Sequence, residues 1–191
     1  MASKQMEKRT TPNDSGAPKK IEAILSEKEI IVSTPSDVDV LSSRGYGVVE
    51  NGKLKLSSYE ALFLLGKGLV EVRLEKSKKE LGFQEVLQCF EALDKNVWVK
   101  YLIYRDLRSR GYVVRDGFGF GVDFRLYKRG EYGKDIAEYI VYGIQEGKPV
   151  SMQELARVLK FAQSAKKKLV LAVLNRRGEV VYYSLSRLTI K

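Results

Sequence analysis

Glycines divide the middle of this chain into short extended runs directly after a helix, and this alternation restricts the fold strongly. Apolar residues at three- and four-residue steps over residues 97–107 predict a helix. Gly111 follows that helix, and glycine tolerates the positive φ that ends many helices. The runs Tyr112–Arg115, Phe118–Leu126 and Ala137–Ile144 predict strands. A helix followed by a glycine-jointed antiparallel sheet indicates a mixed α+β domain.

The first half of the chain predicts a second, smaller α/β unit. Asn51-Gly52 lies between apolar runs, which is the strongest local signal for a β-hairpin. Ser57 and Glu60 form a capping-box pattern that predicts the start of a helix. We therefore expect a disordered basic tail over residues 1–20, an N-terminal α/β domain over 21–93 and a C-terminal domain over 94–191.

The basic charge of the chain favours a polyanionic partner. The formal net charge is +10 at pH 7, and the basic side chains cluster in residues 95–115 and 155–178. Such clustering on a folded domain points to RNA. A basic face that is solvated and binds no ligand is the alternative.

Composition also indicates where the protein functions. A hydrophobic content of 44% suffices for a packed core. No apolar run reaches the roughly 18 residues of a membrane helix, and no signal-like segment is present. We expect a cytoplasmic protein without membrane contact. The single Cys89 excludes an intramolecular disulfide, and its apolar neighbours predict a buried thiol.

Several motifs resemble the archaeal tRNA-splicing endonuclease (tRNA-intron endonuclease) family. The segment Tyr104–Val114, YRDLRSRGYVV, resembles the entry to that family's catalytic domain. Gly119–Phe124 and Ala137–Val141 resemble its next two signature strands, and Ser164–Val173 is similar to its last. Leu54–Gly68 looks like part of the family's N-terminal domain. The resemblance implies a small N-terminal α/β domain followed by a mixed sheet with flanking helices.

The expected activity follows from this resemblance. Enzymes of the family remove introns from precursor tRNA at a tyrosine, histidine and lysine site and leave a 2′,3′-cyclic phosphate. Tyrosine takes the proton of the 2′-OH, histidine protonates the departing 5′-oxygen, and lysine stabilises the charge at phosphorus. The resemblance therefore implies no metal and no cofactor.

Two of the three matching positions carry residues that cannot perform this chemistry. Phe120 stands at the tyrosine position and Ile136 at the histidine position, whereas Lys167 keeps the lysine. Phenylalanine has no hydroxyl to ionise, isoleucine cannot transfer a proton, and the chain contains no histidine. Apolar replacements are expected to keep the former site packed. We therefore expect no catalytic residues and no RNA cleavage by this chain alone.

The sequence and the resemblance together indicate two binding surfaces. The predicted RNA-binding residues are Arg105, Arg108, Arg110, Lys166, Lys167 and Lys168. In the family the final strand packs against its counterpart in a neighbouring subunit, which here indicates Val181, Tyr182, Tyr183 and Leu185. The family also inserts an acidic loop into a basic pocket of the opposing subunit. The matching turn, residues 175–179, has Glu179 as its only acid, so we expect the strand to dominate the interface.

These observations favour a structural, non-catalytic subunit of a heteromeric tRNA-splicing endonuclease. Its expected partners are a catalytic subunit, in a tetramer of two plus two, and precursor tRNA. One alternative is an active nuclease that uses Tyr132 or Tyr139 with Lys167, and another is a stand-alone basic RNA-binding protein. A metal-dependent nuclease based on Asp123 and Glu138 is disfavoured, because tyrosine and isoleucine rather than lysine follow the second acid.

Overall fold

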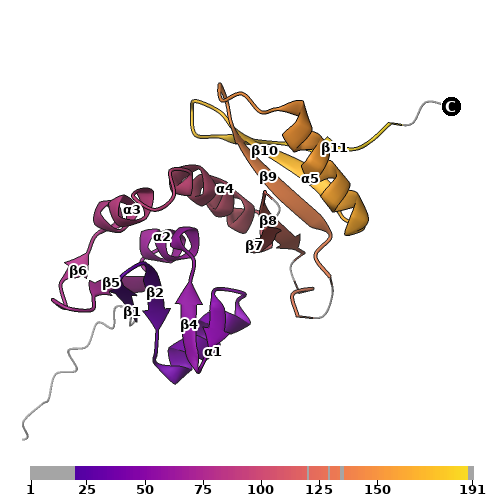
Figure 1. The fold of residues 1–191 in the computed structure, drawn as a ribbon. Helices are drawn as coiled ribbons and strands as arrows, with labels where there is room; N and C mark the ends of the chain where they lie inside the picture. The colour runs from indigo at the N-terminus through magenta and orange to yellow at the C-terminus, as the bar shows by residue number, and fades with distance from the viewer. Residues whose placement is uncertain (1–19, 120, 129, 134–135, 189–191) are drawn as a thin grey trace, which may run out of the picture.

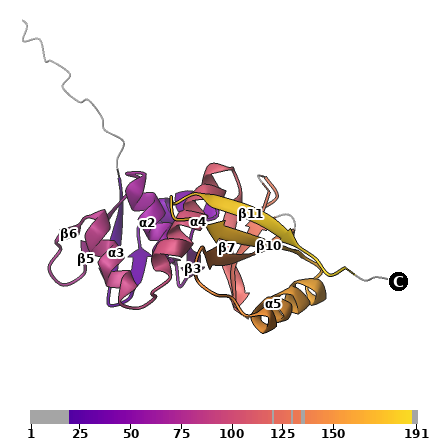
Figure 2. The same cartoon turned by 90° about the horizontal axis from the view of Figure 1, so that it is seen from above.

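Two mixed sheets with flanking helices make up the fold. The structure, a computed structural model, describes residues 20–119, 121–128, 130–133 and 136–188. The sheets lie side by side along the long axis, with helix α4 (Val97–Ser109) between them (Figures 1 and 2). The predicted α+β class is confirmed. The expected basic tail lies, apart from Lys20, outside the described residues.

The N-terminal sheet has six strands in the order β3-β4-β2-β1-β5-β6. In chain order they are β1 (Ile21–Ser26), β2 (Glu29–Val32), β3 (Val48–Glu50), β4 (Lys53–Leu56), β5 (Val70–Leu74) and β6 (Glu80–Leu81). Strands β1 and β5 pair in parallel and the other neighbours pair antiparallel. The accompanying helices are α1 (Pro35–Ser43), α2 (Ser58–Gly66) and α3 (Phe83–Glu91).

Local signals in this half are confirmed. Asn51 and Gly52 have φ of 51° and 75°, as a hairpin turn between β3 and β4 requires. The Glu60 carboxylate accepts a hydrogen bond from the Ser57 backbone N–H at 3.0 Å, as a capping box does.

The prediction for Cys89 is wrong, because its side chain is exposed. The buried stripe of α3 consists of Val86, Leu87 and Phe90. At 100° per residue, Cys89 lies roughly 105° from the centre of that stripe and so faces away from the core. An apolar neighbourhood in sequence therefore did not mean burial.

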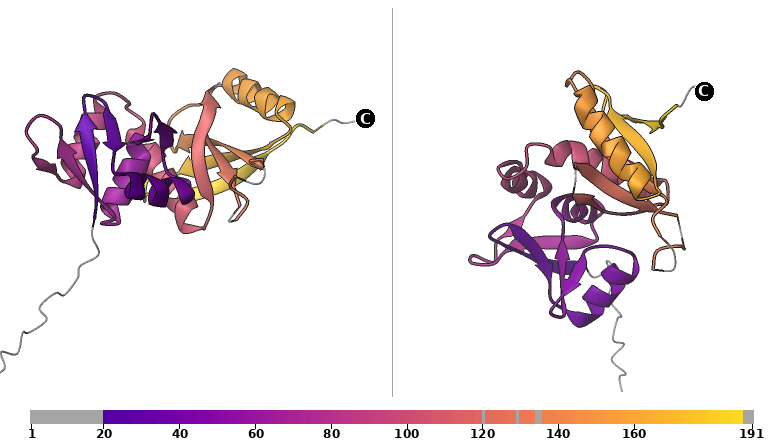
Figure 3. Two further views of the ribbon diagram at one scale, coloured as in Figure 1. Left: turned by 90° about the horizontal axis from the view of Figure 1, so that it is seen from below. Right: turned by 45° about the vertical axis from the view of Figure 1, so that its right-hand side comes forward.

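The C-terminal sheet has five strands in the order β11-β10-β9-β8-β7. They are β7 (Val113–Gly119), β8 (Val122–Tyr127), β9 (Tyr139–Gln145), β10 (Lys168–Leu174) and β11 (Val180–Leu185). Strands β9 and β10 are parallel, and the other pairs are antiparallel. Helix α5 (Met152–Ser164) covers the face turned away from the N-terminal domain, and α4 covers the other face (Figure 3).

The predicted strand Phe118–Leu126 is in fact the turn of a hairpin with parts of two strands. Gly119 and Gly121 have φ of 78° and 81°, which only glycine adopts readily, and β7 and β8 pair antiparallel on either side of them. A side chain at Gly117 would clash with the carbonyl oxygen of Val122. Glycine at this position gives room for a neighbouring backbone.

One continuous core joins the two halves. The ring of Tyr59 on α2 lies 4.9 Å from that of Tyr104 on α4 and 5.1 Å from that of Phe124 on β8. Next to Tyr59 on α2, buried Glu60 accepts a hydrogen bond from Gly47 N–H at 3.1 Å. Its carboxylate lies 3.6 Å from the Arg115 guanidinium. Burial raises the pKa of the Glu60 carboxyl.

Among the described residues, no helix has the length and apolar character of a membrane span.

Candidate functional site

Parallel pairing of β9 and β10 brings two of the predicted site positions together. The backbone N–H of Lys168 donates to the carbonyl of Glu138 at 3.1 Å, so the residues before each strand lie side by side. The Lys167 ammonium donates to the Ala137 carbonyl at 2.5 Å, next to Ile136. The third position, Phe120, lies outside the described residues.

Ile136 does not fill a pocket, and the expectation that it would is wrong. Its side chain is 75% exposed. It precedes β9, so it lies outside the core between α5 and the sheet. Lys167 is half-buried beside it, with its ammonium held by a backbone carbonyl. This arrangement supplies a cation but, at Ile136, no group that can transfer a proton.

Two further lysines anchor the segment that leads into β9. The Glu138 carboxylate accepts from Lys128 and from Lys168, each at 2.7 Å. The Lys128 hydrogen bond first, and then the Lys168 one, lowers the pKa of Glu138 to about 2. The resulting Lys128–Glu138–Lys168 bridge closes the long connection between β8 and β9.

The structure does not join either alternative tyrosine to Lys167. The Tyr132 ring packs edge-on against Tyr127 at 5.3 Å, below the Arg115 guanidinium at 5.7 Å. Tyr139 pairs with Lys168, whose ammonium lies 5.5 Å from its ring. Because side chains alternate along a strand, Tyr139 and Lys167 point to opposite faces of the sheet. No geometry here favours an active nuclease built on these tyrosines.

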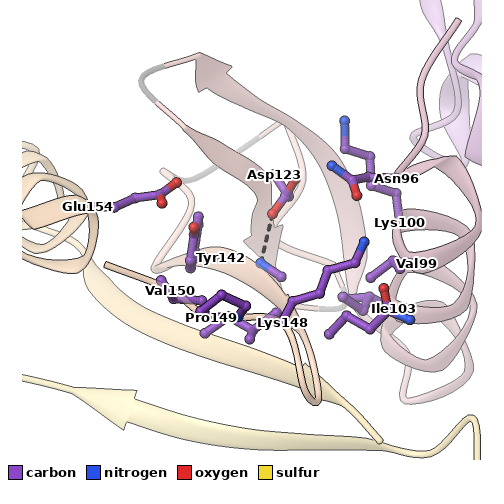
Figure 4. Close-up of a pocket in the computed structure, with 13 residues that line it drawn as sticks. Asn96, Val99, Lys100, Ile103, Asp123, Tyr142, Lys148, Pro149, Val150 and Glu154 are labelled. Carbon is purple, nitrogen blue, oxygen red and sulfur yellow. Dashed lines mark hydrogen bonds between the residues drawn. The ribbon is translucent and has the colours of Figure 1, made fainter. Parts of the chain in front are cut away.

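Asp123 lines a cavity of about 170 Å³ where α4, β9 and the start of α5 meet (Figure 4). Its carboxylate accepts a hydrogen bond from Gly143 N–H at 2.7 Å, and burial raises its pKa. Glu138, the other acid of the metal-nuclease alternative, is held by its two lysines instead. Within the described ranges no three His, Cys, Asp or Glu side chains gather as a metal site would require.

The arginines predicted to bind RNA differ in their surroundings. Arg105 is exposed, with its guanidinium 5.7 Å from the Tyr101 ring. Arg108 stacks on the Tyr46 ring at 4.0 Å and donates to the Arg44 carbonyl at 3.1 Å, so it binds the N-terminal domain to α4. Its role in RNA binding stays a prediction, but its role in the fold is visible.

The remaining predicted cations divide between two faces of the sheet. Arg110 pairs with Asp106 at 2.7 Å and lines the same pocket as Tyr139, over whose ring Lys168 lies. Lys166 is exposed at a φ of 54°, directly before Lys167. The structure thus places Arg110 and Lys168 on the α4 face of the sheet and Lys167 on the opposite face.

The predicted interface strand β11 is an edge of the sheet. Val181 and Tyr183 are 43% and 55% exposed on the α5 side. Tyr182 points the other way and donates a hydrogen bond from its hydroxyl to Asp106 at 2.7 Å. The Glu179 carboxylate accepts from the Asn175 side-chain amide at 2.9 Å. Val181 and Tyr183 therefore form the free apolar face, whereas Tyr182 and Glu179 have partners within the chain.

Comparisons with known proteins agree with the fold in both halves. Residues 97–182 match the family described as tRNA intron endonuclease, catalytic C-terminal domain. Residues 21–87 match the family described as tRNA intron endonuclease, N-terminal domain. The chain belongs to the tRNA intron endonuclease family. Its resemblance to this family, inferred above from motifs, is confirmed.

Relatives of this tRNA intron endonuclease family member come from archaea. A tRNA-splicing endonuclease of Methanococcus vannielii is 37% identical over 172 residues, which cover 90% of this chain and 97% of the relative. One from Methanococcus maripaludis is 36% identical over the same shares. One from Pyrococcus furiosus is 36% identical over 141 residues, 74% of this chain and 80% of the relative. The family fold thus extends over nearly the whole chain.

Sequence reasoning assigned Glu60 only to a helix cap and missed its place at the junction of the two halves. The signal was present: Glu60 is the one charged residue of α2, and every residue from Tyr59 to Leu64 is buried. A carboxylate in an otherwise apolar helix needs a partner if it is buried. Arg115, 55 positions later, could not be identified from spacing.

Proposed function

We propose that this chain is the structural, non-catalytic subunit of a heteromeric tRNA-splicing endonuclease. Two copies would assemble with two copies of a catalytic subunit and act in the cytoplasm on precursor tRNA. The observation that carries the proposal is Ile136, which stands exposed beside Lys167 at the position of the family's proton donor.

The chemistry of RNA cleavage supports this assignment. Forming a cyclic phosphate requires a base for the 2′-OH and an acid for the departing oxygen. Neither Phe120 nor Ile136 can exchange a proton, and the chain has no histidine that could replace them. Lys167 alone would supply only charge stabilisation.

The preserved parts of the molecule support an architectural role. Both family domains match, and the core is continuous from one sheet to the other. The edge strand β11 exposes Val181 and Tyr183, and an uncovered apolar edge is a liability unless a partner covers it. A net charge of +10 suits a subunit that helps to hold tRNA.

A three-way cleavage assay tests the proposal. Precursor tRNA is incubated with this chain alone, with its catalytic partner alone and with both mixed. We expect no cleavage by this chain and full activity only in the mixture. Robust cleavage by the isolated, nuclease-free chain would refute the proposal and favour an active nuclease with unrecognised groups.

A gain-of-function variant makes the same test sharper. The double change Phe120→Tyr and Ile136→His supplies the missing proton-transfer groups beside Lys167. We expect measurable but incomplete cleavage by the mixture of this variant with a catalytically dead partner, because placement errors near 1 Å cost roughly 100-fold. The single change Ile136→His serves as control and should remain inactive.

A further inference from the structure

The first four residues of strand β11 do not specify which face of the strand turns inward. They read Val180-Val181-Tyr182-Tyr183, so one valine and one tyrosine fall on each face. A strand with a single apolar face is held in register by the burial of that face. Here both faces are equally apolar over these residues. Burial of apolar side chains alone therefore does not decide which pair points toward the core.

The turn before β11 holds one end of the strand. The Asn175 side-chain oxygen accepts hydrogen bonds from the backbone N–H groups of Arg177 and Glu179, each at 2.9 Å. Pairing with β10 then extends to Leu185. Strand β11 is the last of its sheet, so within the described residues it has a neighbouring strand on one side alone. Such an edge opens more easily than a central strand.

A second contact holds β11 at its third residue, Tyr182. The Tyr182 hydroxyl donates to Asp106 Oδ2 at 2.7 Å, and Arg110 Nε donates to the same oxygen at 2.7 Å. The Arg110 guanidinium also lies 5.3 Å from the Tyr182 ring. Burial first, and then the bond to Asp106, raises the pKa of the Tyr182 hydroxyl, which therefore stays a donor at neutral pH. These three side chains join the edge strand to the end of α4.

The place of Asp106 on α4 is unfavourable without this contact. Asp106 lies in the last turn of the helix, which ends at Ser109. A carboxylate at that end meets the negative pole of the helix dipole. The bonds from Arg110 and Tyr182 compensate, because hydrogen bonds to an ionised acceptor are stronger than those between neutral groups. With 29% of its side chain exposed, the carboxylate is also partly shielded from water.

We propose that Asp106 is a positioning residue for the subunit interface and acts by holding Tyr182. When Tyr182 is bound to α4, the alternation of side chains turns Val181 and Tyr183 to the α5 side, where both are exposed. A partner then meets an edge strand that is already ordered, and assembly loses less conformational entropy. The inference rests on the proposed function, in which β11 contacts a neighbouring subunit.

Hydrogen–deuterium exchange of the full chain tests the hold on the strand. Tyr182→Phe removes the hydroxyl and keeps the ring. We expect the amides of β11 to exchange roughly 2- to 12-fold faster, the range that loss of one hydrogen bond produces, with the N-terminal sheet unchanged. Tyr112→Phe, which removes another hydroxyl from the same side of the sheet, is the control and should alter neither region. Unchanged exchange in β11, or equal acceleration throughout the chain, would overturn the proposal.

A double-mutant cycle on assembly tests the consequence for the interface. Tyr182→Phe and Asp106→Ala should each weaken assembly of the mixed subunits several-fold, as measured by sedimentation. The double variant should lose no more than Asp106→Ala alone, because the two changes remove the same bond. Asp106→Asn keeps an oxygen acceptor for the hydroxyl and should lose less. Fully additive losses would mean that the two residues act separately, which contradicts the proposal.

Tyr183→Asp separates a failure of this inference from a failure of the proposed interface. If Tyr183→Asp splits the complex while Tyr182→Phe assembles as tightly as wild type, β11 is the interface but Asp106 does not position it. If neither change weakens the complex, the subunits meet elsewhere and the inference falls with the interface. Neither result depends on RNA cleavage, so the three-way cleavage assay remains an independent test of the non-catalytic role.

Discussion

The junction between the two sheets and the region matched to the family's cleavage site differ sharply in how strongly the structure holds them. At the junction, Tyr104 and Phe124 are fully buried and their rings pack with Tyr59. At the matched site, Ile136 is 75% exposed and Lys167 contacts a backbone carbonyl. Packing restricts which side chains can stand at the junction, whereas only the cleavage reaction would restrict the side chains at the matched site. This contrast is what a subunit that keeps the fold but has lost the reaction should show.

Removing one side chain from each region should give the largest difference. Phe124→Ala leaves a cavity beside the rings of Tyr59 and Tyr104 and should lower the free energy of unfolding by about 3–5 kcal/mol. Ile136→Ala should change it by less than about 0.5 kcal/mol, because the side chain is already in water. Chemical denaturation of both variants measures the two values. Similar losses at the two positions would contradict the contrast.

The edge strand β11 should behave as a junction between subunits. Tyr183→Asp would place an unpaired charge in a covered apolar face and destabilise the assembled complex by several kcal/mol. Glu179→Ala removes a carboxylate that already accepts a hydrogen bond from Asn175 in the same chain, so it should weaken assembly modestly. Sedimentation of the mixed subunits distinguishes them. An intact complex with Tyr183→Asp would mean that the subunits meet elsewhere.

Lys167 allows a test of whether the matched site still participates in the reaction. Lys167→Ala in this chain should leave the single-turnover rate of the assembled enzyme within about 2-fold of wild type. If Lys167 contacts a phosphate, RNA binding should weaken and the salt slope should fall by about 0.7–0.9. Lys53→Ala, an exposed lysine of the N-terminal domain, is the matched control. A large loss of rate with assembly intact would assign the lysine to catalysis.

The smallest expected effect concerns the Lys128–Glu138–Lys168 bridge. Its two lysines hold the pKa of Glu138 at about 2, below the roughly 4.3 of an unfolded chain. The stabilisation is therefore complete above about pH 4.3 and is lost as the pH falls toward 2. The unfolding midpoints of wild type and Glu138→Gln should differ slightly at neutral pH and converge over that range. A difference that persists at pH 2 would mean that the charge is not the cause.

The sequence alone determined the class of the fold and which chemical groups the chain can offer at the matched positions. Turn glycines, the capping box and the hairpin signal act over a few residues, so Gly111, Ser57 and Asn51-Gly52 were interpreted correctly. The identity of Ile136, together with the lack of histidine, limits the chemistry without any coordinates. These inferences hold because they depend on backbone preferences and on functional groups that are present or absent.

Only the tertiary structure decided which side chains meet. The chain reversal at Gly119 and Gly121 split one predicted strand into two, and the direction of Cys89 depended on where α3 lay against the core. The partnership of Glu60 with Arg115 spans residues far apart in sequence, as does the pocket that gathers Tyr112, Tyr139 and Tyr182. Such contacts arise from strand pairing and helix packing between residues far apart in the sequence. They cannot be inferred from the spacing of residues along the chain.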